Sequence, residues 1–179
     1  MRTTWILVVL AACGTGDDGG DVPGSANEPP ELAGITMLHN QVRAGVQTGT
    51  ALPPMTWSSE LAATAAAWVA QCRDTEAPSG LVDHNDGRSQ GHPYYVGENI
   101  FASSGGATAQ AAVSSWASEA ADYDYASGQC NGVCGHYTQI VWRDSVEVGC
   151  ALGTCSGLRF SSTIVCNYGP GGNSGGKPY

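Results

Sequence analysis

The sequence predicts an α+β domain that is stapled by disulfides. Three segments with helical periodicity occupy the larger, N-terminal part of the chain, between residues 32 and 121. Segments with the residue pattern of strands follow between residues 146 and 166. Beyond Cys13 the cysteines form an even set of six, which is typical of a disulfide framework in an exported protein.

Residues 1–12 have the features of an export signal. Arg2 supplies a positive charge, and the apolar run over residues 5–10 is too short to span a bilayer. The sequence Leu-Ala-Ala-Cys that ends at Cys13 resembles a bacterial lipobox, which predicts acylation of this cysteine; an ordinary secretory signal is the alternative. Several acyl chains on one residue anchor a protein stably. We therefore expect an exported, lipid-anchored protein of the cell envelope, at the outer membrane or cell surface, and otherwise a secreted one.

Residues 13–31 are expected to form a flexible acidic linker, because they contain little that can bury apolar surface. The folded domain is expected over residues 32–179, a length that suits one domain with a core and not two. The chain carries 16 acidic and 7 basic residues, a net charge of −9. This charge argues against nucleic acid as a partner, and membrane contact is expected only through the lipid anchor.

The first helix is predicted to begin near residue 32 and to end at Gly45 or Gly49. The second is predicted over residues 61–72, with Ser58 or Ser59 as its N-cap. The third is predicted over residues 108–121. The apolar residues expected on their buried faces are Leu32, Ile35, Leu38, Val42 and Val46; Leu61, Ala65, Trp68, Val69 and Cys72; and Val113, Trp116, Ala117 and Ala120.

Residues 74–96 form a long irregular stretch that contains His84 and His92, and loops of this length are usually functional or poorly ordered. The chain returns to the core at residues 97–101. Residues 146–150 and 158–166 are predicted to pair as an antiparallel hairpin. The glycine-rich tail over residues 169–179 contains no residue expected in the core.

The segment from Cys130 to Trp142 is predicted to be a pinned loop that delivers the imidazole of His136 to a fixed place. Two cysteines four residues apart either close a tight loop or bind a metal as thiolates. The cysteine spacings form no pair of matched C-x-x-C motifs, so a thiolate zinc site is not favoured. The alternative for His136 is a buried histidine without a function.

Two motifs, GHYTQIVWRDS at residues 135–145 and CNYGPGGN at residues 166–173, resemble the signatures of the CAP superfamily. This superfamily comprises cysteine-rich secretory proteins, antigen 5 and plant pathogenesis-related proteins, and its shared unit is the SCP domain. HNQVR at residues 39–43, GENI at 97–100 and WASE at 116–119 extend the resemblance over the whole predicted domain. The resemblance implies a three-layer α-β-α sandwich with a small antiparallel sheet.

The resemblance also implies a cleft that holds two histidines and two glutamates. By their positions in the motifs these are Glu98, Glu119 and His136, and His84 completes the set, with His92 as the alternative. Two imidazoles would bind Zn²⁺ or a similar divalent cation weakly and exchangeably. The carboxylates would orient the imidazoles.

The disulfides that the resemblance to plant members implies are Cys72–Cys155, Cys130–Cys134 and Cys150–Cys166. The loop between Cys130 and Cys134 is smaller than in those plant relatives. The tail over residues 170–179 is similar to a segment that plant relatives release as a signalling peptide, but it lacks one residue. We interpret this likeness as shared ancestry.

The leading functional hypothesis is a binding module for a sterol, a fatty acid or a protein partner, with a divalent cation in its cleft. Residues 139–150 resemble the family stretch that is linked to sterol binding. The alternative is a metal-assisted hydrolase or protease with Glu98 or Glu119 as the base. No recognisable motif supplies a serine or cysteine nucleophile. A toxin-like or immune-interaction protein is a third class.

Overall fold

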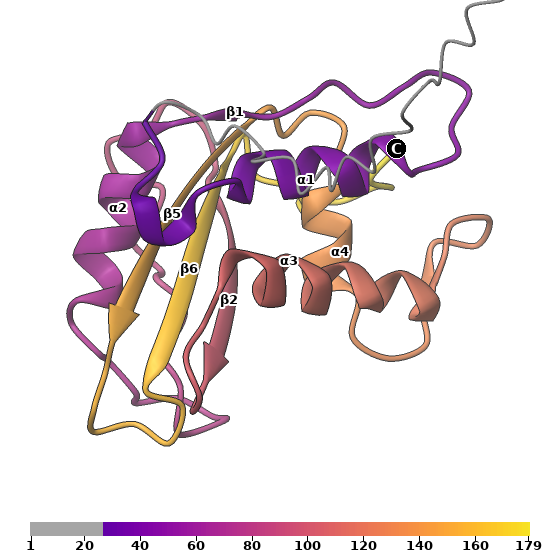
Figure 1. Cartoon of the computed structure of the whole chain (residues 1–179). Coiled ribbons are helices and arrows are strands. Elements are labelled where there is room, and N and C mark those ends of the chain that lie inside the picture. Colours follow the sequence, from indigo (N-terminus) through magenta and orange to yellow (C-terminus); the bar gives the residue numbers. More distant parts are fainter. Residues whose placement is uncertain (1–26) are drawn as a thin grey trace, which may run out of the picture.

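The computed structural model describes residues 27–179 (Figure 1). The expectations for residues 1–26, which include the export signal and the acylation of Cys13, lie outside the described residues. Within residues 27–179, no helix has both the length and the apolar character needed to cross a bilayer.

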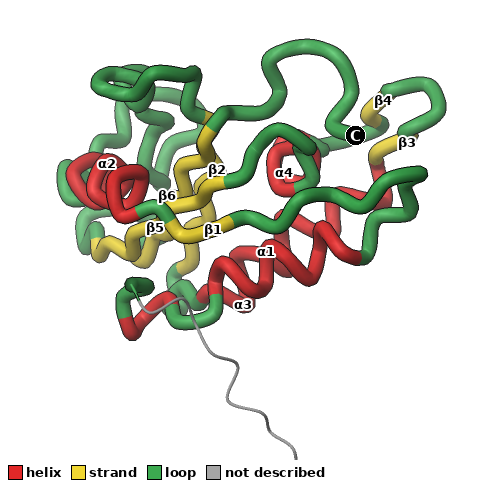
Figure 2. The backbone as a smooth tube through the Cα atoms, turned by 90° about the horizontal axis from the view of Figure 1, so that it is seen from above, coloured by secondary structure: helices red, strands yellow, loops and turns green. Residues whose placement is uncertain are grey.

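The domain is a three-layer sandwich, which confirms the predicted fold class (Figure 2). Helix α2 covers one face of a four-stranded sheet, and α1, α3 and α4 lie over the other face. One apolar cluster fills each of the two interfaces. The helices are α1 (Ile35–Ala44), α2 (Ser59–Val69), α3 (Ala109–Ser118) and α4 (Gly135–Ile140), with 3-10 turns η1 (Pro30–Leu32) and η2 (Glu119–Asp122).

The sheet has the order β1-β5-β6-β2. Strands β5 and β6 pair antiparallel as predicted, and β2 pairs antiparallel with β6. The short β1 pairs parallel to β5, so the sheet is mixed. Both faces of β6 are buried because helices cover both. The strand starts later than predicted, since Leu158 and Phe160 lie in the turn before it. The strands are β1 (Thr56–Trp57), β2 (Gly97–Ser103), β5 (Glu147–Thr154) and β6 (Ser162–Gly169), and a separate hairpin comprises β3 (Tyr123–Asp124) and β4 (Gln129–Cys130).

Side-chain caps set the starts of α2 and α3. The hydroxyl of Ser58 accepts a hydrogen bond from the N–H of Leu61, and that of Thr108 accepts one from Ala111. Helix α3 ends three residues before the predicted boundary, where the chain tightens into η2. Ala120 is therefore exposed and does not belong to the buried face.

Helix α2 packs directly on the sheet at Gly149. A Cβ at this position would collide with the backbone of Ser58 and Ala62. The absence of a side chain in β5 thus permits the close approach of the helix, and the disulfide between Cys72 and Cys155 joins the chain just after α2 to the end of β5.

The folded domain begins earlier than residue 32. Glu28 accepts hydrogen bonds from the N–H groups of Gly34 and Thr36, at 2.7 and 3.0 Å. A carboxylate at this place satisfies free N–H groups of the first turn of α1 and interacts favourably with the helix dipole. The last residues of the expected linker are therefore part of the domain.

The tail also contributes to the core, contrary to the prediction from its composition. Pro178 is buried, and its carbonyl accepts a hydrogen bond from the N–H of Arg143 at 2.7 Å. Tyr179 packs against the larger apolar cluster and stacks on Tyr125 with ring centroids 4.5 Å apart. Gly175 and Gly176, which precede it, have φ angles of 116° and 83°, a backbone conformation that favours glycine.

The structure joins Cys72 to Cys155, Cys130 to Cys134 and Cys150 to Cys166, the same pairs that the resemblance implies. Disulfides of this kind are typical of extracellular proteins.

Candidate functional site

Two histidine–glutamate pairs form the centre of the candidate site. His84 Nδ1 lies 2.7 Å from Glu98 Oε1, and His136 Nδ1 lies 2.6 Å from Glu119 Oε1. Since each Nδ1 donates to a carboxylate, each ring is held in the orientation and tautomer that leaves Nε2 as an acceptor.

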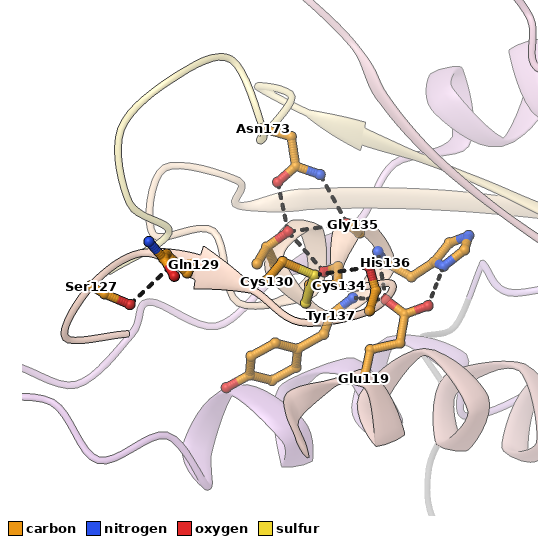
Figure 3. Close-up of a disulfide and its surroundings, with 11 residues drawn as sticks. Glu119, Ser127, Gln129, Cys130, Cys134, Gly135, His136, Tyr137 and Asn173 are labelled. Carbon is orange, nitrogen blue, oxygen red and sulfur yellow. Dashed lines mark hydrogen bonds and ion pairs between the residues drawn. A yellow bond between two sulfur atoms is a disulfide. The ribbon is translucent and has the colours of Figure 1, made fainter. Parts of the chain in front are cut away.

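The His136–Glu119 pair is built where η2 meets the start of α4 (Figure 3). Glu119 Oε2 accepts hydrogen bonds from the backbone N–H groups of His136 and Tyr137, at 2.9 and 3.1 Å. The glutamate thus both caps α4 and orients the imidazole. The ring of His136 stacks on Trp116, with centroids 6.1 Å apart and planes inclined by 16°.

A disulfide pins the loop as expected from the sequence, but His136 itself lies in the short helix that follows this loop. The disulfide between Cys130 and Cys134 closes the turn immediately before α4 (Figure 3). Arg43, which is buried, holds the other end by donating to the carbonyls of Ile140 and Trp142 at 2.7 and 2.8 Å. Burial lowers the pKa of Arg43 to about 10, so the side chain stays charged at neutral pH.

The His84–Glu98 pair joins the long loop to β2. Glu98 Oε1 accepts from His84 Nδ1 and from the N–H of Asn85, and the side chain of Glu98 is fully buried. Its second oxygen, Oε2, has no hydrogen-bond partner among the described residues. His92 lies elsewhere: its Nε2 is 3.2 Å from the hydroxyl of Thr64. The structure therefore brings His84, and not His92, to Glu98.

Both histidines border two adjoining hollows. The first is a polar cleft of about 430 Å³, and the second is a more apolar groove of about 360 Å³. Because His84 and His136 line both, the cleft and the groove meet at the imidazoles. Glu98 lies in the wall of the cleft, whereas Glu119 stands behind His136. The cleft is also lined by Arg88, Tyr95, Gln139 and Asn173, and the groove by Leu81, Val82, Ile100, Ala102 and Phe160.

A buried polar network supports the cleft from behind. His39 Nδ1 lies 2.7 Å from the carbonyl of Ile35, so Nδ1 carries the proton and Nε2 accepts from the hydroxyl of Tyr168 at 2.8 Å. Asn99 donates to the same hydroxyl and to the carbonyl of His136. Burial lowers the pKa of His39 to about 4, which keeps the ring neutral. His39, noted in the sequence only as part of a motif, is thus a support of the site.

Some residues that line the cleft were not singled out as functional from the sequence. They lie in the loop before β2, in α4 and in the tail. Arg88 donates to the carbonyl of Val96 and to the hydroxyl of Tyr95, both at 2.8 Å. Gly97, the first residue of the GENI motif, leaves space for the side chain of Gln139, which a Cβ would strike. Gly97 and Gln139 both lie in motifs that the sequence analysis quoted, and those motifs were the available signal.

The donor set fits a divalent cation held by two protein ligands. Nε2 of His84 and of His136 is available at the same cleft, and each ring has the carboxylate partner that is usual behind a metal-bound imidazole. Within residues 27–179, no group of three or more histidine, cysteine, aspartate or glutamate side chains is arranged to hold a metal. Any such ion would therefore complete its coordination with water or a ligand.

The stretch that resembles the sterol-linked region, residues 139–150, is mainly structural. Ile140, Val141 and Trp142 are buried in or beside the core, and Val148 lies within the sheet. Of this stretch, Gln139 lines the cleft, and none of its residues lines the groove.

Comparisons with known proteins agree with this architecture. A model described as "CAP: Cysteine-rich secretory protein family" matches residues 36–168. A pathogenesis-related protein 1 of Arabidopsis thaliana is 41% identical over 159 residues, which cover 88% of this chain and 87% of that protein. GLIPR1-like protein 1 of Homo sapiens is 36% identical over 183 residues, which cover 96% of this chain and 71% of that protein.

Solved structures show the same fold. Venom allergen-like protein 4 of Schistosoma mansoni matches with a TM-score of 0.64 and 27% identity, over 84% of this chain and 94% of that one. NaASP2, whose crystal structure is described as containing Zn²⁺, matches with a TM-score of 0.61 and 26% identity, over 87% of this chain and 88% of that one. The chain therefore belongs to the cysteine-rich secretory protein (CAP) family.

Proposed function

We propose that this protein is an exported binding module that holds a divalent cation, Zn²⁺ or a similar ion, between His84 and His136 and takes a hydrophobic ligand beside it. One observation carries the proposal: both imidazoles, each with Nδ1 engaged by a glutamate, border a polar cleft on one side and an apolar groove on the other. A cation in the cleft and an apolar group in the groove would then lie side by side.

The orphaned oxygen of Glu98 supports a polar ligand at this place. A buried carboxylate oxygen without a hydrogen-bond donor is unfavourable, and a donor group that enters the cleft would relieve it. The NaASP2 structure, described with Zn²⁺, gives further support because it shares the fold at 26% identity. When bound, the cation would supply positive charge at the cleft, while the protein orients the two rings.

Calorimetric titration with Zn²⁺ tests the cation site. We expect binding to the wild type that His84→Ala and His136→Ala each abolish, while His92→Ala binds as the wild type does. Unchanged binding in the first two variants would rule out these ligands.

The hydrophobic ligand is expected in the groove, because its lining is more apolar than that of the cleft. A binding assay with a sterol and a fatty acid tests this point. Leu81→Asp places a charge in the groove and should weaken binding at least about tenfold. Val133→Asp, at an exposed apolar residue that lines neither hollow, is the matched control and should bind normally.

A metal-assisted hydrolase is the alternative function, and the structure separates its two candidate bases. Glu119 accepts three hydrogen bonds, whereas Glu98 keeps one oxygen free. The cysteines of the described residues are all in disulfides, so none supplies a thiol nucleophile. Turnover of a peptide or ester library with Zn²⁺ that is lost in Glu98→Gln would replace the binding proposal.

Attachment of the protein to a membrane through acylated Cys13 is part of the same proposal. Metabolic labelling with a clickable fatty acid checks it, with Cys13→Ser as the control. If the mature wild-type protein carries no label, the lipid anchor is ruled out and the alternative of a secreted protein stands.

A further inference from the structure

Strand β2 lies at the end of the sheet, so one of its edges has no strand partner. Cys150 and Cys166 face each other across β5 and β6 with Cα atoms 4.1 Å apart, the short spacing of a pair that shares no ladder hydrogen bonds. The N–H and C=O of Cys166 therefore point toward β2, where Asn99 is its partner. Asn99 is thus a residue of β2 whose main chain faces into the sheet.

Alternation along the strand then turns the main-chain groups of Glu98, Ile100 and Ala102 to the outer edge. A separate contact agrees: the indole N–H of Trp116 donates to the carbonyl of Ile100 at 3.3 Å. Among the hydrogen bonds of the described residues, this indole is the one partner outside the sheet ladder that bonds to the main chain of Glu98, Ile100 or Ala102. The N–H of Ile100 and both main-chain groups of Ala102 remain available at the edge.

The available edge lies beside the groove. Ile100 and Ala102 are both half-buried and line the groove with Leu81 and Phe160. Toward Glu98 the same edge leads from the groove to the cleft. His84 and His136 border both hollows there. The indole of Trp116, which donates to the carbonyl of Ile100 and stacks on His136, lies on this edge. An added chain would therefore pair with Ile100 and Ala102 and end beside the indole.

We propose that the outer edge of β2 binds an extended peptide segment as an additional strand. Main-chain donors and acceptors at strand spacing are complementary to another extended main chain, and a lipid cannot satisfy them. Every second side chain of the peptide would face the apolar lining of the groove. The chain carries a net charge of −9, so basic residues suit the positions whose side chains face away from the groove. This interaction goes beyond the proposed cation and hydrophobic-ligand sites. It does not depend on the cation, but the peptide side chains would occupy the same groove as the hydrophobic ligand.

The probe is the fluorescein-labelled peptide Lys-Val-Lys-Val-Lys-Val, blocked at both ends and measured by fluorescence anisotropy with EDTA present. Two further peptides carry N-methyl groups on the three lysines or on the three valines. Since an added strand pairs through one edge, one methylated peptide should bind at least about tenfold more weakly and the other should bind as the parent does. Equal affinities of all three peptides, or no binding of the parent, would overturn the proposal.

Ala102→Pro tests the protein side, because it removes an N–H that the sheet ladder does not use, and proline is tolerated on a strand edge. We expect binding to fall about fivefold to tenfold, while Ala102→Val, which keeps the N–H, stays within about twofold. Zinc binding and the circular dichroism spectrum report whether Ala102→Pro is folded. If it is not, the methylated peptides decide alone.

Sedimentation of the chain without peptide distinguishes a second copy as the occupant. The proposal expects a monomer. A dimer that Ala102→Pro dissociates would assign the edge to self-association and overturn the peptide proposal. Loss of zinc binding in His84→Ala with peptide affinity unchanged would show that the two sites are independent.

Discussion

The two histidine–glutamate pairs contain the same groups at nearly the same distances, but their surroundings differ. His136 is the second residue of a helix, stacks on Trp116 and has its carbonyl held by Asn99, and its side chain is 29% exposed. His84 extends from a loop with 55% of its side chain exposed, although its partner Glu98 is fully buried. The comparison indicates that the His136 pair is a rigid wall of the cleft and that the His84 pair is the side that can adapt to a ligand.

The largest expected effect comes from removing the support beneath the rigid pair. Arg43→Met leaves the carbonyls of Ile140 and Trp142 without their buried donor, and we expect a loss of about 3–5 kcal/mol in the free energy of unfolding. Arg143→Met removes exposed hydrogen bonds and should change it by less than about 1 kcal/mol. Urea denaturation measures both. Equal effects would mean that burial of Arg43 has no special role.

The second prediction concerns pH and the network behind His136. Because the pKa of His39 is about 4 in the folded state and near 6.5 in the unfolded chain, the unfolded state binds more protons between these values. The stabilisation is present above pH 6.5 and is lost as the pH falls toward 4, by about 3 kcal/mol. Between pH 7 and pH 4, the free energy of unfolding of the wild type should therefore fall by about 3 kcal/mol more than that of His39→Gln. Parallel pH profiles in denaturant melts would contradict the assignment.

The third prediction compares the two glutamates directly. In Glu119→Gln the amide N–H₂ faces another donor, either the N–H groups of His136 and Tyr137 or Nδ1 of His136. The free energy of unfolding should therefore fall by about 1–3 kcal/mol. Glu98→Gln can keep both bonds at Oε1 and place its N–H₂ where Oε2 has no partner, so we expect a change below about 1 kcal/mol. Thermal denaturation of the two variants side by side is the measurement. A larger loss in Glu98→Gln would reverse the ranking of rigid and adaptable pairs.

The smallest effect is expected at His92. It contacts Thr64 and stacks on Tyr94, away from Glu98, so His92→Ala should change the stability by less than about 1 kcal/mol. Histidine NMR signals followed during Zn²⁺ addition give a second readout. We expect the His84 and His136 signals to shift and the His92 signal to stay in place, and a shift confined to His92 would contradict the choice of His84.

Much of the helical layer could be predicted from the sequence, because periodicity and capping residues act locally. Ser58 and Thr108 mark helix starts through bonds to residues three positions away. The short α4 was not predicted: its ends are secured by Glu119 and Arg43, which are distant in sequence. The tail was misjudged for a similar reason, since Tyr179 is held by residues such as Tyr125 that only the fold brings near.

The sequence by itself determined the family, the fold class and three residues of the candidate site, Glu98, Glu119 and His136, because motifs and residue periods are written in consecutive positions. It left His84 and His92 as alternatives for the fourth residue, and the structure places His84 against Glu98. The tertiary structure alone decided how those residues are used: Glu119 behind His136, Glu98 buried with a free oxygen, and both imidazoles between a cleft and a groove. The physical reason is that burial and hydrogen-bond partners depend on which distant segments pack together, and hollows and strand edges exist only once the layers have assembled.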